Sequence, residues 1–261
     1  ITLGSVAGGA NSTLAIDVAD AAAVPTLKIP GAAKNIYYKG SAAADLITIE
    51  GAISDSTFTL GDGDNTFTAQ KGTAAYQAMN NVEISSAGDG KTIVKGGVYT
   101  AGATGNAINL AGAGANEITL SGVASKVAGT SAAITMTGAD GVAQKMTVTG
   151  AVKNLNFTGG AGNEDVILEK GATDSTITLG EGTNKFIAGD EAMTKGQALK
   201  NVDIAASGDA GVTTVFAGAY TTGAGTTGVP KINTIKLGEG ANTITLGSVA
   251  KLYRIDLRNA S

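Results

Sequence analysis

The sequence predicts an all-β protein that folds as a parallel β-solenoid, of the β-helix or β-roll kind, and three observations lead to this fold class. The chain is repetitive, because residues 55–67 match residues 174–186 at nine of thirteen positions. Short runs of Thr and apolar residues alternate with glycine-rich turns, which is typical of stacked repeat units. The composition, with 39 glycines, 4% aromatic residues and no Cys, His or Trp, suits a thin core of small side chains.

The repeat unit is about 120 residues long. Residues 1–7 return with two changes at 118–124 and without change at 244–250. This predicts one solenoid repeat over 1–117, a second over 118–243, and the start of a third over 244–261, whose tail from residue 251 is atypical in composition. No charged or proline-rich linker separates the units, so they are expected to pack as one body. Because the chain starts in mid-pattern and without Met, we expect it to be a segment of a longer protein that carries its anchor elsewhere.

The local pattern is strand, turn, strand. Thr57–Leu60 and Thr66–Thr68 flank the turn Gly61–Asn65, and the same pattern surrounds Gly238–Asn242. Alternating β-branched and polar residues predict half-buried strands, while Gly and Asn supply the positive φ angles of tight turns. Two-residue loops would favour hairpins, whereas these turns have five residues, which favours the corners of a parallel coil. Sandwich domains of about 120 residues built from hairpins are the alternative.

One segment in each unit departs from the strand pattern. Residues 71–79 and 191–199 are rich in Ala, Met, Gln and Leu, and each is followed by a strand. Good helix formers in this arrangement predict a short helical insertion in each repeat.

Composition also limits the function. A net charge of −4 and a pI near 4.9 argue against nucleic-acid binding, which needs a basic surface. No apolar run approaches the ~20 residues of a membrane-spanning helix. The absence of Cys fits an extracellular bacterial protein without disulfides.

The turn motif is the strongest chemical indication. The pattern Gly-x-Gly-x-Asn recurs at Gly61–Asn65, Gly112–Asn116, Gly180–Asn184 and Gly238–Asn242. It resembles the glycine-rich nonapeptide of the repeats-in-toxin family and, with the neighbouring segments, bacterial surface-layer proteins and large adhesins. The resemblance implies a parallel β-roll with calcium in its turns. The implied calcium ligands in this chain are Asp62, Asp64, Asn65, Glu181 and Asn184.

This chain departs from the family at the calcium-ligating Asp, which is Asn at all four turns. Calcium prefers several carboxylates, and in the β-roll adjacent turns each supply half of a site. The alternative is that the Asn side chains hydrogen-bond along the turns in place of the metal.

Two further functions compete with a structural role. Paired threonines such as Thr57 and Thr59 are similar to the threonine ladders of ice-binding solenoids, although long stretches of the chain lack them. Clustered carboxylates can cleave glycosidic bonds, and the candidates for such an acid/base group are Asp45, Glu164, Asp165 and Glu169. The absence of His and Cys argues against other common catalytic groups, so we expect no enzymatic activity.

These observations together predict a structural repeat segment of a secreted protein at the bacterial cell surface. The expected partners are copies of the chain itself, assembled into a surface-layer lattice or a filament. The main alternative is an extender segment of a large adhesin that is stiffened by calcium. A carbohydrate-active β-helix and an ice-binding solenoid are the remaining possibilities.

Overall fold

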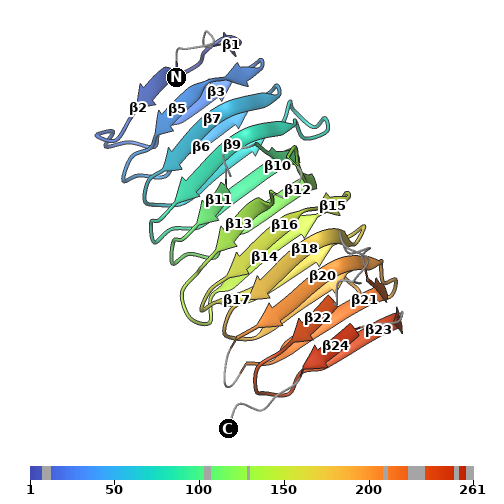
Figure 1. Cartoon of the computed structure of the whole chain (residues 1–261). Coiled ribbons are helices and arrows are strands. Elements are labelled where there is room, and N and C mark those ends of the chain that lie inside the picture. Colours follow the sequence, from blue (N-terminus) through green and yellow to red (C-terminus); the bar gives the residue numbers. More distant parts are fainter. Residues whose placement is uncertain are drawn as a thin grey trace.

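The computed structural model describes residues 1–7, 13–102, 107–127, 130–207, 211–222, 233–249 and 253–256. In these ranges every regular element is a β-strand, and the strands form one sheet wound into a parallel solenoid of about nine turns. Figure 1 shows the turns stacked in sequence order from one end of the molecule to the other. All the strand pairings are parallel, so the predicted fold class is confirmed and hairpin-built domains are excluded.

Each turn of the solenoid has three faces, which we call A, C and B in the order in which the chain crosses them. Face A consists of β3 (Thr26–Ile29), β6 (Leu46–Ile49), β8 (Asn65–Ala69), β14 (Ala143–Val148), β17 (Asn163–Leu168), β19 (Asn184–Ala188) and the first halves of β10 (Thr92–Ala101), β12 (Glu117–Ser125), β21 (Thr213–Thr221) and β23 (Thr243–Val249).

Face C is narrow and is reached after a bend. It consists of β1 (Val6–Ala7), β4 (Ala33–Lys34), β15 (Val152–Lys153), the second halves of β10, β12, β21 and β23, and the first residues of β7 (Ile53–Leu60), β9 (Met79–Ser86), β18 (Ala172–Leu179) and β20 (Leu199–Ala206). Face B consists of the remaining parts of β7, β9, β18 and β20 with β2 (Leu14–Asp17), β5 (Ile36–Lys39), β11 (Ala107–Leu110), β13 (Ala132–Met136), β16 (Leu155–Gly159), β22 (Asn233–Lys236) and β24 (Tyr253–Asp256).

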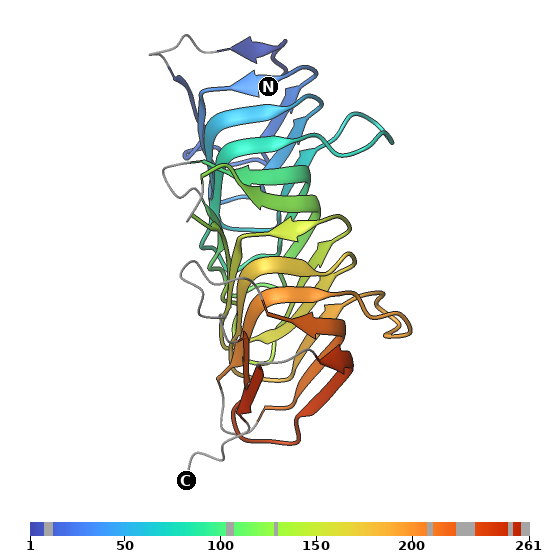
Figure 2. The ribbon, with the colours of Figure 1, turned by 45° about the vertical axis from the view of Figure 1, so that its right-hand side comes forward.

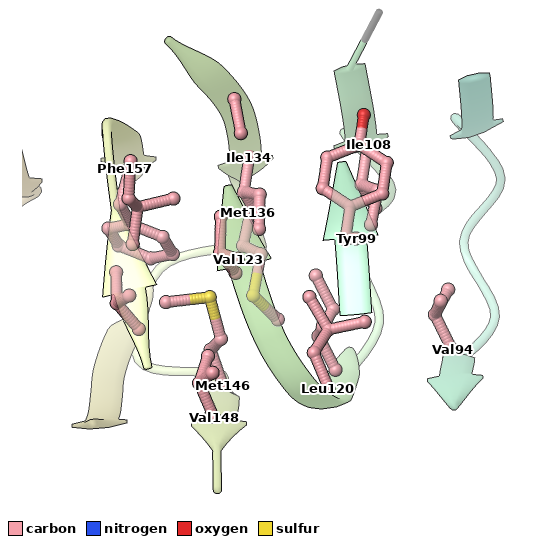
Figure 3. Packing of buried hydrophobic residues seen from close by; sticks show 14 of the residues in the cluster. Val94, Tyr99, Ile108, Leu120, Val123, Ile134, Met136, Met146, Val148 and Phe157 are labelled. Carbon is pink, nitrogen blue, oxygen red and sulfur yellow. The ribbon is translucent and has the colours of Figure 1, made fainter. Parts of the chain in front are cut away.

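The core consists of columns of like side chains that run along the axis, because parallel in-register pairing places each residue above its counterpart in the previous turn. The central column of face B becomes exposed at its last member, Ile255 in β24, and is buried in the turns before it: Ile16, Tyr38, Phe58, Ile84, Ile108, Ile134, Phe157, Ile177, Ile204 and Ile235. Figure 3 shows part of this column facing residues of faces A and C. Each such side chain contributes roughly 1.5–3 kcal/mol when fully buried, so the columns supply most of the driving force for folding.

The columns cross the expected repeat boundaries without a break. The boundaries at residues 117/118 and 243/244 fall inside β12 and β23, and pairing is continuous on both sides of them. The described structure therefore gives no support to a layout of two 120-residue units. The structural repeat is a single turn, and residues paired in successive turns are 20 to 31 positions apart.

The prediction of a short helix in each repeat is wrong. Residues 71–79 and 191–199 contain turns and bends, closed by isolated antiparallel bridges between Gln70 and Tyr76 and between Gly189 and Gly196. Gly72 and Met193 have positive φ angles, which a right-handed helix does not contain, and so short a helix has little stability of its own. Each segment is instead an excursion between faces A and C, and Figure 2 shows both on the same side of the stack. In the part of the chain that the structure describes, no helix is long and apolar enough to cross a membrane.

Candidate functional site

A column of polar side chains lies inside the solenoid, at the corner where the chain passes from face B to the next strand of face A. The register of the strands places one such residue in each successive turn. All but the last of its members are at most 4% exposed: Asp45, Asn65, Thr92, Asn116, Gln144, Glu164, Asn184, Thr213 and, at the end, Asn242. Polar groups at this depth destabilise a protein unless they are hydrogen-bonded, so their partners decide what the column does.

The first pair of polar residues closes a ring of three hydrogen bonds. The backbone N–H of Asp45 donates to Asn65 Oδ1 at 2.8 Å, and Asn65 Nδ2 donates to the carbonyl of Gly61 at 2.8 Å. The N–H of Gly61 donates to Asp45 Oδ2 at 2.9 Å, which completes the ring. Asp45 Oδ1 accepts two further bonds, from the Tyr38 hydroxyl at 2.8 Å and the Ser41 N–H at 3.3 Å. The ring fixes the turn 61–65 to the turn below it.

The same ring recurs about 120 residues later. The N–H of Glu164 donates to Asn184 Oδ1 at 3.0 Å, Asn184 Nδ2 donates to the Gly180 carbonyl at 3.0 Å, and the Gly180 N–H donates to Glu164 Oε2 at 3.2 Å. The other oxygen, Glu164 Oε1, accepts the N–H of Gly160 at 2.9 Å. We call each ring a corner lock, because it joins two successive corners of the solenoid.

Between the two locks the column uses neutral amides in the same way. Asn116 Oδ1 accepts the N–H of Thr92 at 2.9 Å, and Asn116 Nδ2 donates to the Gly112 carbonyl at 3.4 Å. Gln144 Oε1 accepts the Asn116 N–H at 3.3 Å, and its Nε2 donates to the Gly114 carbonyl at 2.8 Å. The final contacts of this kind join Thr213, Gly238 and Asn242.

The two glycines of the turns 61–65 and 180–184 have different structural roles. A Cβ atom at the first glycine would lie 1.5 Å from the Ser41 carbonyl oxygen at Gly61 and 1.6 Å from the Gly160 carbonyl oxygen at Gly180, so stacking excludes a side chain there. The third residue needs a positive φ, which is 79° at Gly63 and 85° at Gly182. The Asn of the motif does not have a positive φ, contrary to the expectation. Its side chain points inward and forms the hydrogen bonds of the corner lock.

The predicted calcium ligands lie in two different environments. Asn65 and Asn184 are buried in the column with their amides engaged, whereas Asp62, Asp64 and Glu181 are exposed in the turns. Asp64 Oδ1 accepts the Lys91 N–H at 2.8 Å from the next turn. Asn65 and Asn184 are five turns apart, or roughly 24 Å at 4.8 Å a turn, so the five residues form no single site. Among the described residues no three carboxylates gather closely enough to hold a metal ion, and calcium binding stays a prediction.

The carboxylates considered for catalysis are also separated. Asp45 and Glu164 lie five turns apart in the column, roughly 24 Å, whereas glycosidase carboxylates lie about 5–10 Å apart. Asp165 points outward from face A between Lys145 and Lys185; burial raises its pKa and the two lysines lower it. Glu169 lies at the corner beyond β17, beside the second excursion.

The second excursion lies against the outside of face A. Glu191 Oε1 accepts a hydrogen bond from Lys145 Nζ at 2.7 Å, which raises the pKa of Lys145 and lowers that of Glu191. Ile167 and Ile187 point outward from the same face, yet they are at most 1% exposed. The ion pair joins Glu191 of the excursion to Lys145, which lies two turns back on face A.

Sequence reasoning missed the corner between faces C and B. Six residues there have φ between 50° and 56°, in the left-handed region that Asn and Asp tolerate best: Asn35, Asp55, Asn81, Asn154, Asp174 and Asn201. Asn81 Nδ2 donates to Asp55 Oδ1 at 2.9 Å, and Asn201 Nδ2 donates to Asp174 Oδ1 at 2.6 Å. The sequence indication was an Asn or Asp at nearly the same spacing in both halves of the chain, 20 and 26 residues in the first half and 20 and 27 in the second.

The threonine pairs do not form one ladder. Thr57 with Thr59 and Thr176 with Thr178 point outward from face B, whereas Thr66 with Thr68 point outward from face A. Between the two pairs on face B, the outward residues are small or uncharged except for Glu83: Ser85, Ala107, Asn109, Ala133, Thr135, Asn156 and Thr158. The part of face B between Thr57 and Thr178 is therefore almost uncharged and carries no regular threonine array, whereas its outward residues in other turns include Asp17, Lys39, Asp203 and Lys236.

Comparisons of the chain with family models, with curated proteins and with solved structures found no match.

Proposed function

We propose that this chain is a structural segment of a secreted bacterial surface protein and that it assembles with copies of itself into a surface-layer lattice or a filament. The observation that carries the proposal is the continuity of the core columns and of the polar column through the described turns. Such a stack is a rod in which each turn is bonded to the next along three faces, and a repeat architecture of this kind offers an extended surface for contacts.

Face B is the surface that we propose for contacts between copies. Its outward side chains from Thr57 to Thr178 are hydroxyls, amides and methyl groups, with Glu83 as the exception. By contrast, face A carries outward Lys95, Glu117, Lys145, Asp165 and Lys185. The centres of protein interfaces are depleted in charged residues, which favours face B over face A.

Electron microscopy of the purified chain tests this proposal. Negatively stained samples at micromolar concentration, with and without millimolar calcium, are expected to show sheets or filaments, and light scattering is expected to rise with concentration. If assembly requires calcium, the exposed turn carboxylates Asp62, Asp64 and Glu181 become the candidate ligands.

The second candidate function is an extender segment of a large adhesin. The stiffness expected of continuous columns and corner locks favours it equally, because an extender holds a binding domain away from the cell. An extender has no need to self-associate. Isolated rods under both calcium conditions would therefore refute lattice formation by this chain and support the extender.

A further inference from the structure

Glu164 and Asp45 occupy matching positions in the two corner locks but have different hydrogen-bond donors. Asp45 accepts three bonds, one of them from the Tyr38 hydroxyl at 2.8 Å. Burial and the bond to Asp45 raise the pKa of Tyr38, so the hydroxyl keeps its proton at neutral pH. The residue at the matching position near Glu164 is Phe157, which has no hydroxyl. The Glu164 carboxylate accepts the N–H groups of Gly160 and Gly180, and none of its hydrogen bonds in the described residues comes from a side chain.

Among the described residues, no cation forms an ion pair with Glu164 in place of the missing donor. Its neighbours in the column are the neutral side chains of Gln144 and Asn184, and Gly159 leaves the space that its carboxyl occupies. The nearest charged groups on the packed elements point away from it. Lys145, Asp165 and Lys185 lie on the outer side of face A, and Glu181 is exposed in the next turn.

We propose that Glu164 is a proton-binding site that makes the stability of the turns at residues 159–164 and 180–184 depend on pH in the neutral range. A carboxylate that is 1% exposed, without a counter-ion and with two N–H donors, is poorly compensated for its lost hydration. The proposal concerns this lock alone and does not depend on self-assembly.

The direction of the effect follows from proton linkage. Burial raises the pKa of Glu164 from 4.5 to about 7, although the N–H groups of Gly160 and Gly180 act to lower it. The folded chain therefore holds a proton that the unfolded chain releases between pH 4.5 and 7. The contribution of this group to stability is fully present below pH 4.5 and is lost as the pH rises through 7.

Carbon-13 NMR of the Glu carboxyl groups tests the proposal on the unmodified protein, with Glu164→Gln to assign the signal. The expected midpoint of the Glu164 titration is about 7, and a midpoint near the ordinary 4.5 would overturn the proposal. Hydrogen exchange supplies a second readout. The protection factors of the Gly160 and Gly180 amides are expected to fall about tenfold per pH unit between pH 4.5 and 7, and about 300-fold in all. The Gly61 amide in the other lock reports changes common to the whole solenoid.

A transplanted donor set tests the physical cause. The double substitution Phe157→Tyr with Glu164→Asp reproduces the side chains of the Asp45 lock at this position. Its carboxyl is expected to titrate at least one pH unit lower than Glu164, because the hydroxyl donates to the ionised form. An unchanged midpoint would show that the missing hydroxyl is not the cause. Should this variant fail to fold, the titration of the unmodified chain decides the proposal alone.

Discussion

Removal of one corner-lock amide should destabilise the solenoid far more than removal of its exposed neighbour. In the variant Asn65→Ala, the N–H of Asp45 and the carbonyl of Gly61 lose their partners at a buried corner. An unpartnered buried polar group costs about 1–3 kcal/mol, so the two groups together predict a loss of roughly 2–6 kcal/mol. The matched control is Thr66→Ala, because Thr66 is adjacent in the chain and points outward, and its loss should change stability by about 0.5 kcal/mol or less.

Two measurements would check this prediction. Urea unfolding followed by circular dichroism gives the total loss, and hydrogen exchange at the amides of Asp45 and Gly61 shows whether the loss is local, as expected when turns interact with their neighbours. A loss below about 0.5 kcal/mol in Asn65→Ala, or equal effects of the two substitutions, would refute the argument that the lock stabilises the corner.

Three further predictions test other parts of the structure. Gly180→Ala should abolish soluble expression, because its Cβ would lie 1.6 Å from the Gly160 carbonyl oxygen, whereas Gly4→Ala, with open space, should not. Asn154 has a φ of 56°, which Gly adopts freely and Ala does not. Asn154→Ala should therefore lower the free energy of unfolding by about 1 kcal/mol, whereas Asn154→Gly should leave it nearly unchanged. Glu191→Gln should change the unfolding free energy by less than about 1 kcal/mol but speed protease cleavage within residues 189–198, because an exposed ion pair holds that excursion.

The fold class was predictable because the strand residues that form the core and the turns between them recur along the sequence. In the strand segments 57–60 and 66–68, apolar and polar residues alternate with a period of two. The five-residue turn between these segments is too long for a two-residue hairpin. The sequence period of about 120 residues was misleading as a guide to structural units. This period arises because similar corner residues recur about 120 positions apart, such as Asp45 with Asn65 and Glu164 with Asn184. The turns that carry them stack without interruption.

Two local features could not be predicted from the sequence, and each has a physical reason. The segments at 71–79 and 191–199 have helical composition, but the chain must leave face A and return to face C within a few residues, which favours a closed excursion over a helix. The inward direction of Asn65 depends on strand register, which the sequence does not show locally. Register placed this amide between two turns, where it bonds backbone groups of both.

The central proposal, that copies of this chain assemble through face B, is tested most directly by one pair of matched variants. Thr135→Glu places a charge at the middle of face B, and Thr119→Glu places the same charge on face A beside Lys95. Sedimentation velocity, with negative-stain images of the same samples, is expected to show that Thr135→Glu remains monomeric while Thr119→Glu assembles like the unmodified chain. Assembly of both variants, or of neither, would contradict the assignment of face B as the contact surface.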